Sequence, residues 1–265
     1  MKKSKYAALC RMHCLLFLTF LCQTAFPQIQ DKYAEWGPTS RRSMTGVIVR
    51  GGYVIGGTTP VPVPGEIRGI EAFHPIGGVT VGADAYHQFS RRWAVQLGLH
   101  VFYEGFHTQA TVKNYRMAIR QGLDYLEGHF TGTDVTDTWM VGLTIPLTAA
   151  FDISPRWRVS AGPFVSFLFD KAFEGEAYDG YLREGNPTGQ KVEISTENRA
   201  TYDFRENMNS KYWGVEVVFD WKAMRHMNVF GGIDWACSSI FPSSFHTVEF
   251  KMMPIYAKLG FAYRY

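Results

Sequence analysis

The last eleven residues of the chain, 255–265, alternate between two kinds of side chain. One set is apolar or aromatic and comprises Ile255, Ala257, Leu259, Phe261, Tyr263 and Tyr265. The other set is mostly small or charged and comprises Tyr256, Lys258, Gly260, Ala262 and Arg264. A period of two places the sets on opposite faces of a β-strand. In a transmembrane barrel, apolar side chains face lipid, polar or small ones face the lumen, and aromatics lie at the interfaces. The stretch therefore predicts a membrane-spanning strand.

Earlier segments of the chain have the same alternation, which is clearest between Trp93 and Glu104. These segments are residues 47–56, 76–89, 93–104, 139–148, 157–170, 213–221 and 228–236. With the last stretch they make eight strands, and bacterial outer-membrane barrels have an even strand number. The pattern predicts an all-β fold, an eight-stranded antiparallel up-and-down transmembrane β-barrel of the outer-membrane type.

The connections between these segments alternate in length. Short turns lie around residues 91, 154 and 224, and long connections cover about 57–75, 109–136, 171–210 and 238–247. In outer-membrane barrels the short turns are periplasmic and the long loops are external. We therefore expect four external loops.

Two of these loops contain patterns of their own. Apolar residues recur at spacings of three and four between Tyr115 and Leu126, which predicts a short amphipathic helix. In the loop 171–210, the pairs Val192/Ile194 and Tyr202/Phe204 predict a hairpin that stands above the membrane.

The amino-terminal segment has the form of an export signal. A lysine-rich start precedes the apolar run Cys14–Cys22, and Ala25 to Gln28 stands where a cleavage site belongs. We expect residues 1–28 to be a secretory signal peptide, 29–43 a short periplasmic leader, and 44–265 the barrel. The alternative is a lipoprotein signal acylated at Cys22, but the bulky Leu21 before it disfavours this.

The composition of the chain argues against several other classes of protein. The chain has 265 residues and a formal charge of only +3, so we expect no nucleic-acid partner. After the signal, no apolar run approaches the ~20 residues that a membrane helix needs. Of the four cysteines, only Cys237 lies outside the predicted signal, so the mature chain cannot form an internal disulfide.

Several features together resemble a known family. They are the signal peptide, a glycine-rich first strand, tryptophan-opened hairpins after Ser-Arg-Arg and Ser-Pro-Arg turns, and the terminal stretch Gly260–Tyr265. In this combination the chain resembles the small outer-membrane β-barrel proteins of Bacteroidetes, the PorT-like group. The resemblance covers nearly all of the mature chain. It implies the barrel architecture and carries over no catalytic motif, although a role beside a secretion or polysaccharide-uptake machine would fit this group.

The inward faces of the predicted strands carry a set of polar side chains. They are Arg50, Asp84, Gln96, His100, Glu104, Arg158, Glu216, Asp220, Asp234, Lys258 and Arg264. An eight-stranded barrel is just wide enough for side chains to fill, and buried charges must be paired. We expect a polar network that closes the lumen. The alternative is a narrow ion path or a gated ligand site.

The sequence contains little evidence for a catalytic, metal or cofactor site. His100 and Glu104 share an inward face and could form an acid–base pair, but a lone histidine there is more often a hydrogen-bonded core residue. Ser244, His246 and Glu249 resemble the serine–histidine–acid groups of barrel enzymes that act on lipid A, without a matching order or spacing. The histidines show no metal-ligand spacing, and there is no phosphate-binding loop or dinucleotide fingerprint. We expect no catalytic residues, metal or cofactor.

The sequence therefore favours a non-enzymatic integral outer-membrane barrel that acts as an interaction or accessory module. Its expected partners are outer-membrane lipid and a protein of a cell-envelope complex, contacted through the external loops or the periplasmic rim. Two alternatives remain: a small transport or pore component, and a lipid A-modifying enzyme.

Overall fold

The computed structural model describes residues 44–60, 63–121, 124–245, 247 and 251–265. All of the described residues belong to one compact unit. The predicted signal peptide and leader lie outside the described residues. The elements are β1 (Met44–Pro60), β2 (Ile67–Gln88), β3 (Trp93–Gln121), β4 (Asp124–Asp152), β5 (Trp157–Glu184), β6 (Lys191–Ile194), β7 (Ala200–Asp203), the 3-10 helix η1 (Arg205–Asn207), β8 (Lys211–Lys222), β9 (Met227–Ala236) and β10 (Met252–Arg264).

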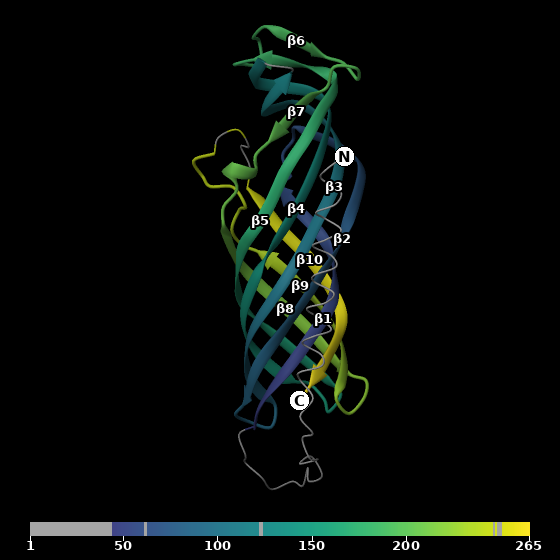
Figure 1. Ribbon diagram of the computed structural model, residues 1–265, viewed down its shortest axis with the longest axis vertical. Coiled ribbons are helices and arrows are strands. Elements are labelled where there is room, and N and C mark those ends of the chain that lie inside the picture. Colours follow the sequence, from purple (N-terminus) through teal and green to yellow (C-terminus); the bar gives the residue numbers. More distant parts are fainter. Residues whose placement is uncertain (1–43, 61–62, 122–123, 246, 248–250) are drawn as a thin grey trace, which may run out of the picture. The chain divides into compact units, whose positions relative to one another are not determined.

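Within the described chain, eight strands form a closed antiparallel ring (Figure 1). Strands β1 to β5 pair in sequence, β5 pairs with β8, and β9 and β10 follow. The ring closes where β10 pairs with β1, from Arg264 opposite Ile48 to Met252 opposite Pro60. Closure leaves no open sheet edge, which a strand-built membrane protein requires. The predicted eight-stranded antiparallel barrel is confirmed.

The two faces of the ring differ as the alternation predicts. On β3, Leu97 and Leu99 are 54% and 56% exposed, whereas the side chains of Gln96 and His100, which flank them in the sequence, are buried. Such exposure would be unfavourable in water, but it is the outward apolar band that a barrel presents to lipid. Aromatic residues lie at both ends of this band: Trp93, Trp157 and Trp221 near the short turns, and Tyr103, Trp139, Phe169, Trp213 and Trp235 at the far end.

The predicted short turns lie at the expected places, and two of them share one mechanism. The hydroxyl oxygen of Ser90 accepts hydrogen bonds from the backbone N–H groups of Arg92 and Trp93. Ser154 does the same for Arg156 and Trp157. Serine at the start of a turn supplies this acceptor, which explains why both tight turns begin with it.

Two predicted loops prove to be largely strand. Instead of a connection at 57–75, β1 continues to Pro60 and β2 begins at Ile67. Instead of a loop with a helix at 109–136, β3 runs to Gln121 and β4 begins at Asp124. The helix prediction is wrong because Met117, Ala118 and Ile119 are buried at consecutive positions. A strand covered on both faces loses the period of two, and its apolar residues can then mimic a helical spacing.

The hairpin predicted within 171–210 is also wrong. Strand β5 continues to Glu184, and β6 and β7 pair separately with it rather than with each other. Strand β7 also pairs with β3 through Thr201 opposite Arg120, so the sheet curls round on itself. In the connection predicted at 238–247, the described residues are irregular, as expected.

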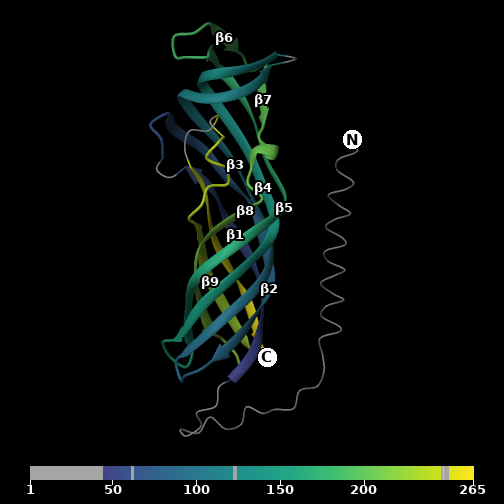
Figure 2. The same cartoon turned by 90° about the vertical axis from the view of Figure 1, so that its left-hand side faces the viewer.

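Strands β3, β4 and β5 continue beyond the ends of β8, β9 and β10 and carry β6 and β7 (Figures 1 and 2). We call this part the head: residues 105–121, 124–138 and 173–207, which include β6, β7 and η1. It has its own apolar core, which includes Val112, Met117, Ile119, Phe130, Leu182 and Ile194. An aromatic cluster continues this core towards the barrel and contains Phe173, Tyr202, Phe204, Phe241 and Phe245. Folding of the head therefore follows from ordinary apolar burial in water.

The lipid-facing band provides a test of the inside–outside assignment. Replacing Leu97 by Arg should lower the free energy of unfolding in bilayers by about 2–4 kcal/mol, because it places a charge near the bilayer midplane. Replacing Gln109 by Arg, on the same strand and face but in the head, should change it little. Urea unfolding of protein refolded into vesicles measures both. Equal effects of the two substitutions would show that the membrane band is misplaced.

Candidate functional site

The barrel lumen holds the polar residues predicted from the inward faces of the strands. Nine of the eleven side chains are buried, and Asp234 and Arg264 are half-buried. They form three groups along the lumen, and most partners come from different strands.

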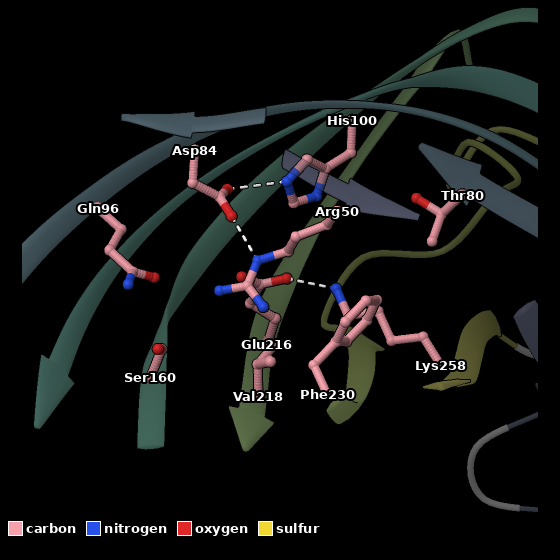
Figure 3. Close-up of a pocket in the computed structure, with 10 residues that line it drawn as sticks. All are labelled: Arg50, Thr80, Asp84, Gln96, His100, Ser160, Glu216, Val218, Phe230 and Lys258. Atoms are coloured by element: carbon pink, nitrogen blue, oxygen red, sulfur yellow. Dashed lines mark hydrogen bonds and ion pairs between the residues drawn. The ribbon is translucent and has the colours of Figure 1, made fainter. Parts of the chain in front are cut away.

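The first group is centred on Arg50 of β1 (Figure 3). Its Nε donates to Asp84 Oδ2 at 2.5 Å, and its Nη1 and Nη2 donate to the two carboxylate oxygens of Asp220 at 2.5 and 3.1 Å. His100 Nε2 lies 2.8 Å from the other oxygen of Asp84. The guanidinium also lies 5.3 Å from the centre of the Phe230 ring. One arginine thereby ties β1 to β2 and, across the lumen, to β8.

The second group is centred on Lys258 of β10. Its Nζ lies 2.6 Å from Glu216 Oε2 and 2.8 Å from Asp234 Oδ1. Glu216 and Asp234 are directly opposite in the β8–β9 pairing, so the ammonium neutralises charge on two neighbouring carboxylates. Glu104, nearby on β3, accepts a hydrogen bond from Tyr212 Oη at 3.1 Å. The alternative acid–base pair of His100 with Glu104 is not formed, because each of these side chains bonds elsewhere.

The third group lies near the short turns. Arg158 makes two hydrogen bonds to Asp152, with Nε to Oδ1 at 2.7 Å and Nη2 to Oδ2 at 2.9 Å. Arg264 Nε donates to Tyr86 Oη at 3.0 Å and stacks over the same ring. The amide oxygen of Gln96 accepts from Thr148 at 3.4 Å.

Sequence reasoning missed four hydrogen-bond partners in this network, Asp152, Tyr86, Thr148 and Tyr212. Tyr86, Thr148 and Tyr212 occupy inward positions of their strands and were identifiable by the alternation, but Asp152 was assigned to a turn. Which inward residues meet across a barrel depends on the stagger between strands, which a single sequence does not reveal.

The lumen has little free space. One cavity of about 10 Å³ lies among Arg50, Asp84 and Lys258, and a second of about 20 Å³ lies among Glu104, Tyr212 and Tyr256. A cavity of this size holds about one water molecule. Tyr212 and Tyr256 belong to the same buried cluster as the aromatic residues Phe173, Tyr202, Phe204 and Phe241, so apolar packing is continuous between the lumen and the head.

The head contains one buried carboxyl of its own. Asp134 on β4 is 7% exposed, and its Oδ1 has no hydrogen-bond partner among the described residues. Burial raises the pKa of Asp134 to about 7, and hydrogen bonds from Tyr202 and Thr136 offset only part of this effect. Tyr202 Oη lies 2.8 Å from Thr136 Oγ1, which links β7 to β4 beside the carboxyl.

Cations stack on aromatic rings along the outside of the head. The pairs are Arg183 and Lys191 with Tyr181, Arg199 with Tyr178, and Arg205 with Trp139. Energetically significant pairs of this kind occur about once per 70–80 residues, so four within residues 139–205 mark an unusual concentration. Three of these cations also pair with a carboxylate: Lys191 with Glu193, Arg199 with Glu176, and Arg205 with Glu174.

Of the alternative catalytic group, Ser244 is exposed, and His246 and Glu249 lie outside the described residues. No group of three or more His, Cys, Asp or Glu side chains in the described ranges is arranged to hold a metal ion. The same part of the chain contains no helix with the length and hydropathy to span a bilayer.

The closed ring, its outward apolar band and its polar interior define an integral outer-membrane β-barrel. The chain belongs to the family described as "Outer membrane protein beta-barrel domain", which matches residues 30–242. Membership in this family places the protein in the bacterial outer membrane.

The chain is also similar to several solved structures. Ail of Yersinia pestis, the attachment invasion locus protein, is 8% identical (83% of this chain and 97% of Ail covered; TM-score 0.36). OprG of Pseudomonas aeruginosa is 16% identical (84% and 97%; 0.34), and CarO2 of Acinetobacter baumannii is 13% identical (83% and 99%; 0.37). A comparison with curated proteins gives no match.

The first lumen group can be tested by removing its cation. Replacing Arg50 by Gln leaves Asp84 and Asp220 buried without a full counter-charge, which should lower the free energy of unfolding by about 3–5 kcal/mol. Replacing Arg205 by Gln, in a half-exposed pair on the head, should change it little. Urea unfolding of the refolded protein measures both. A similarly small effect of the Arg50 substitution would mean that the buried network is not tightly paired.

The buried carboxyl of the head makes local stability depend on pH. Because the pKa of Asp134 is higher in the folded head than its ordinary 3.8, its stabilising effect is complete below about pH 4 and is lost as pH rises to about 7. The shift corresponds to about 4 kcal/mol. Hydrogen exchange of head amides, corrected for intrinsic rates, should show greater protection at pH 5 than at pH 8. Asp134→Asn should remove this difference and Asp137→Asn, with its half-exposed side chain, should keep it.

Proposed function

We propose that this protein is a non-enzymatic outer-membrane barrel with a closed lumen, and that its head acts as an interaction or accessory module for a protein of the cell envelope. The head is the observation that carries this proposal. Strands β3, β4 and β5 have 28 or 29 residues, whereas β8, β9 and β10 have 10 to 13. A membrane strand needs about 9–11 residues, so each long strand has residues to spare for the head.

The outer surface of the head supports a protein contact. Tyrosine, tryptophan and arginine are the residues that contribute most to binding energy at protein interfaces. Here Tyr181 and Tyr178 are held by the stacked cations Lys191 and Arg199, and those cations pair with Glu193 and Glu176. Side chains already fixed in this way lose less conformational entropy when a partner binds.

The side chains that fill the lumen support the proposal that the barrel does not conduct ions. The cavities among the ion pairs of Arg50 and Lys258 have volumes of only about 10 and 20 Å³, which supports a lumen that is closed to hydrated solutes. The outward band, with Leu97 and Leu99 at its centre, contacts outer-membrane lipid under this proposal. Transport is the alternative function, and a steady conductance would favour it.

The remaining parts of the proposal concern origin and export. The glycine-rich first strand and the terminal stretch Gly260–Tyr265 support assignment to the PorT-like group of Bacteroidetes. The composition of residues 1–28 supports export through a cleaved signal peptide. The low net charge of +3 supports the absence of a nucleic-acid partner.

Site-specific photo-crosslinking in living cells tests the interaction. A photoreactive residue at the exposed positions Glu193 or Arg199 of the head should capture one protein in stoichiometric yield. The same residue at Leu97 should capture lipid only, which controls for random collisions in the membrane. Planar-bilayer recording of the purified protein should show no steady conductance. Steady conductance together with no captured protein at the head would replace this function with transport.

A further inference from the structure

Positively charged residues are concentrated at the short turns of the barrel. The turns join β2 to β3, β4 to β5 and β8 to β9, at the end of the barrel that lies away from the head (Figures 1 and 2). We call residues 89–92, 153–156 and 222–226 the basic rim. Its exposed cations are Arg91, Arg92, Arg156, Lys222 and Arg225. The three segments contain no Asp or Glu, so the rim carries a strong positive charge.

Backbone hydrogen bonds join the three turns to one another. The N–H group of Asp152 donates to the carbonyl oxygen of Arg92 at 2.8 Å, and the N–H group of Lys222 donates to the carbonyl oxygen of Arg156 at 2.8 Å. The strands that the turns connect follow one another around the ring, in the order β2, β3, β4, β5, β8 and β9. The five cations therefore lie along one connected edge of the barrel.

Each turn of the basic rim also exposes a large apolar side chain. Phe89, Ile153 and Met224 are 60%, 54% and 68% exposed. The tryptophans that begin β3 and β5, together with Trp221 of β8, lie directly beside them. Tryptophan is enriched at the headgroup level of membranes, where charged groups meet hydrocarbon. A rim with both cations and apolar side chains suits the same level, because lysine and arginine can reach phosphates while apolar groups enter the lipid.

The head has the opposite charge. It contains seven Lys or Arg and twelve Asp or Glu residues. The formal charge of +3 for the whole chain is therefore the sum of a basic end and an acidic end. A charge distribution of this kind attracts an anionic surface at the rim and repels it at the head.

We propose that the basic rim binds the phosphate groups of anionic phospholipids in the leaflet that surrounds the short turns. Guanidinium and ammonium groups form charge-assisted hydrogen bonds with phosphate oxygens. The apolar side chains of the same turns favour a phospholipid over an acidic protein, because a phospholipid provides hydrocarbon beside its charge. In the expected orientation of the barrel this is the periplasmic leaflet of the outer membrane.

Lipid binding at the rim has a structural effect of its own. Because cations on three turns contact the headgroup layer together, the barrel cannot tilt or shift along its axis without losing some of these contacts. The rim therefore fixes the depth of the barrel in the membrane. It lies at the end opposite the head, so the protein contact proposed for the head can fail without affecting lipid binding at the rim.

Quenching of tryptophan fluorescence by brominated lipid tests the proposal. The barrel without the predicted signal peptide is refolded into mixed vesicles of phosphatidylcholine and phosphatidylglycerol, and either one lipid or the other carries bromine in its acyl chains. Phenylalanine in place of Trp139, Trp213 and Trp235, at the far end, confines most of the signal to the rim. At low salt, phosphatidylglycerol should quench several-fold more efficiently, because each Lys or Arg near an anionic surface strengthens binding up to about fivefold. High salt should reduce this preference.

A rim variant removes one cation from each turn. The triple change Arg92→Gln, Arg156→Gln and Lys222→Gln should abolish most of the preference for phosphatidylglycerol, and each single change should remove part of it. The backbone hydrogen bonds that join the turns do not involve these side chains, and heat-dependent mobility on a gel verifies that each variant is folded. Arg92→Lys together with Arg156→Lys keeps the charge and should keep the preference.

A head variant provides the matched control. Lys113→Gln, Arg116→Gln and Arg120→Gln remove the same charge at the opposite end and should leave the lipid preference unchanged. The proposal is overturned if the unsubstituted rim shows no preference for phosphatidylglycerol, which is the result expected of a rim that contacts an acidic protein instead. It is equally overturned if the preference persists in the rim variant, or if the head variant loses as much of it.

Discussion

The pairing of β1 with β10 is the contact on which the rest of the barrel depends, because it converts a sheet with two open edges into a ring. In hydrocarbon an unpaired backbone group costs several kcal/mol, so an open edge could not persist there. Glycine makes this close approach feasible. A Cβ atom on Gly52 would come within 2.8 Å of the Leu259 carbonyl oxygen, and one on Gly260 would clash with the backbone of Gly51. The glycine-rich composition of the first strand therefore serves the closure.

Closure with eight strands also determines what the interior can be. The lumen of such a barrel is only as wide as its own side chains, so inward residues must pack against one another. Their polarity is tolerated because almost every charge meets an opposite charge from another strand, as Arg50 meets Asp220 and Lys258 meets Glu216. The same pairs act as cross-links inside the ring, so the interior contributes to fixing which strands face each other.

The sequence predicted the transmembrane part well because one physical rule governs it. Each spanning strand has lipid on one side and the lumen on the other, so alternation identified both the strand and its inward residues, from Arg50 to Lys258. The rule fails in the head, where water surrounds the sheet and strands curl over a core of their own. There Met117 to Ile119 are buried in succession, and β6 and β7 each pair with β5. Such pairings depend on distant contacts that no local pattern encodes.

The head also has a consequence for biogenesis. Its charged side chains, Arg183, Arg199 and Glu176 among them, belong to segments that lie between membrane strands in the sequence. Strand β10, which closes the ring, follows all of them in the chain. Under the expected external placement of the long connections, these hydrophilic segments have to cross the bilayer, and the lumen of a complete eight-stranded barrel is filled by its own side chains. That placement therefore implies that the head is translocated before the wall is sealed.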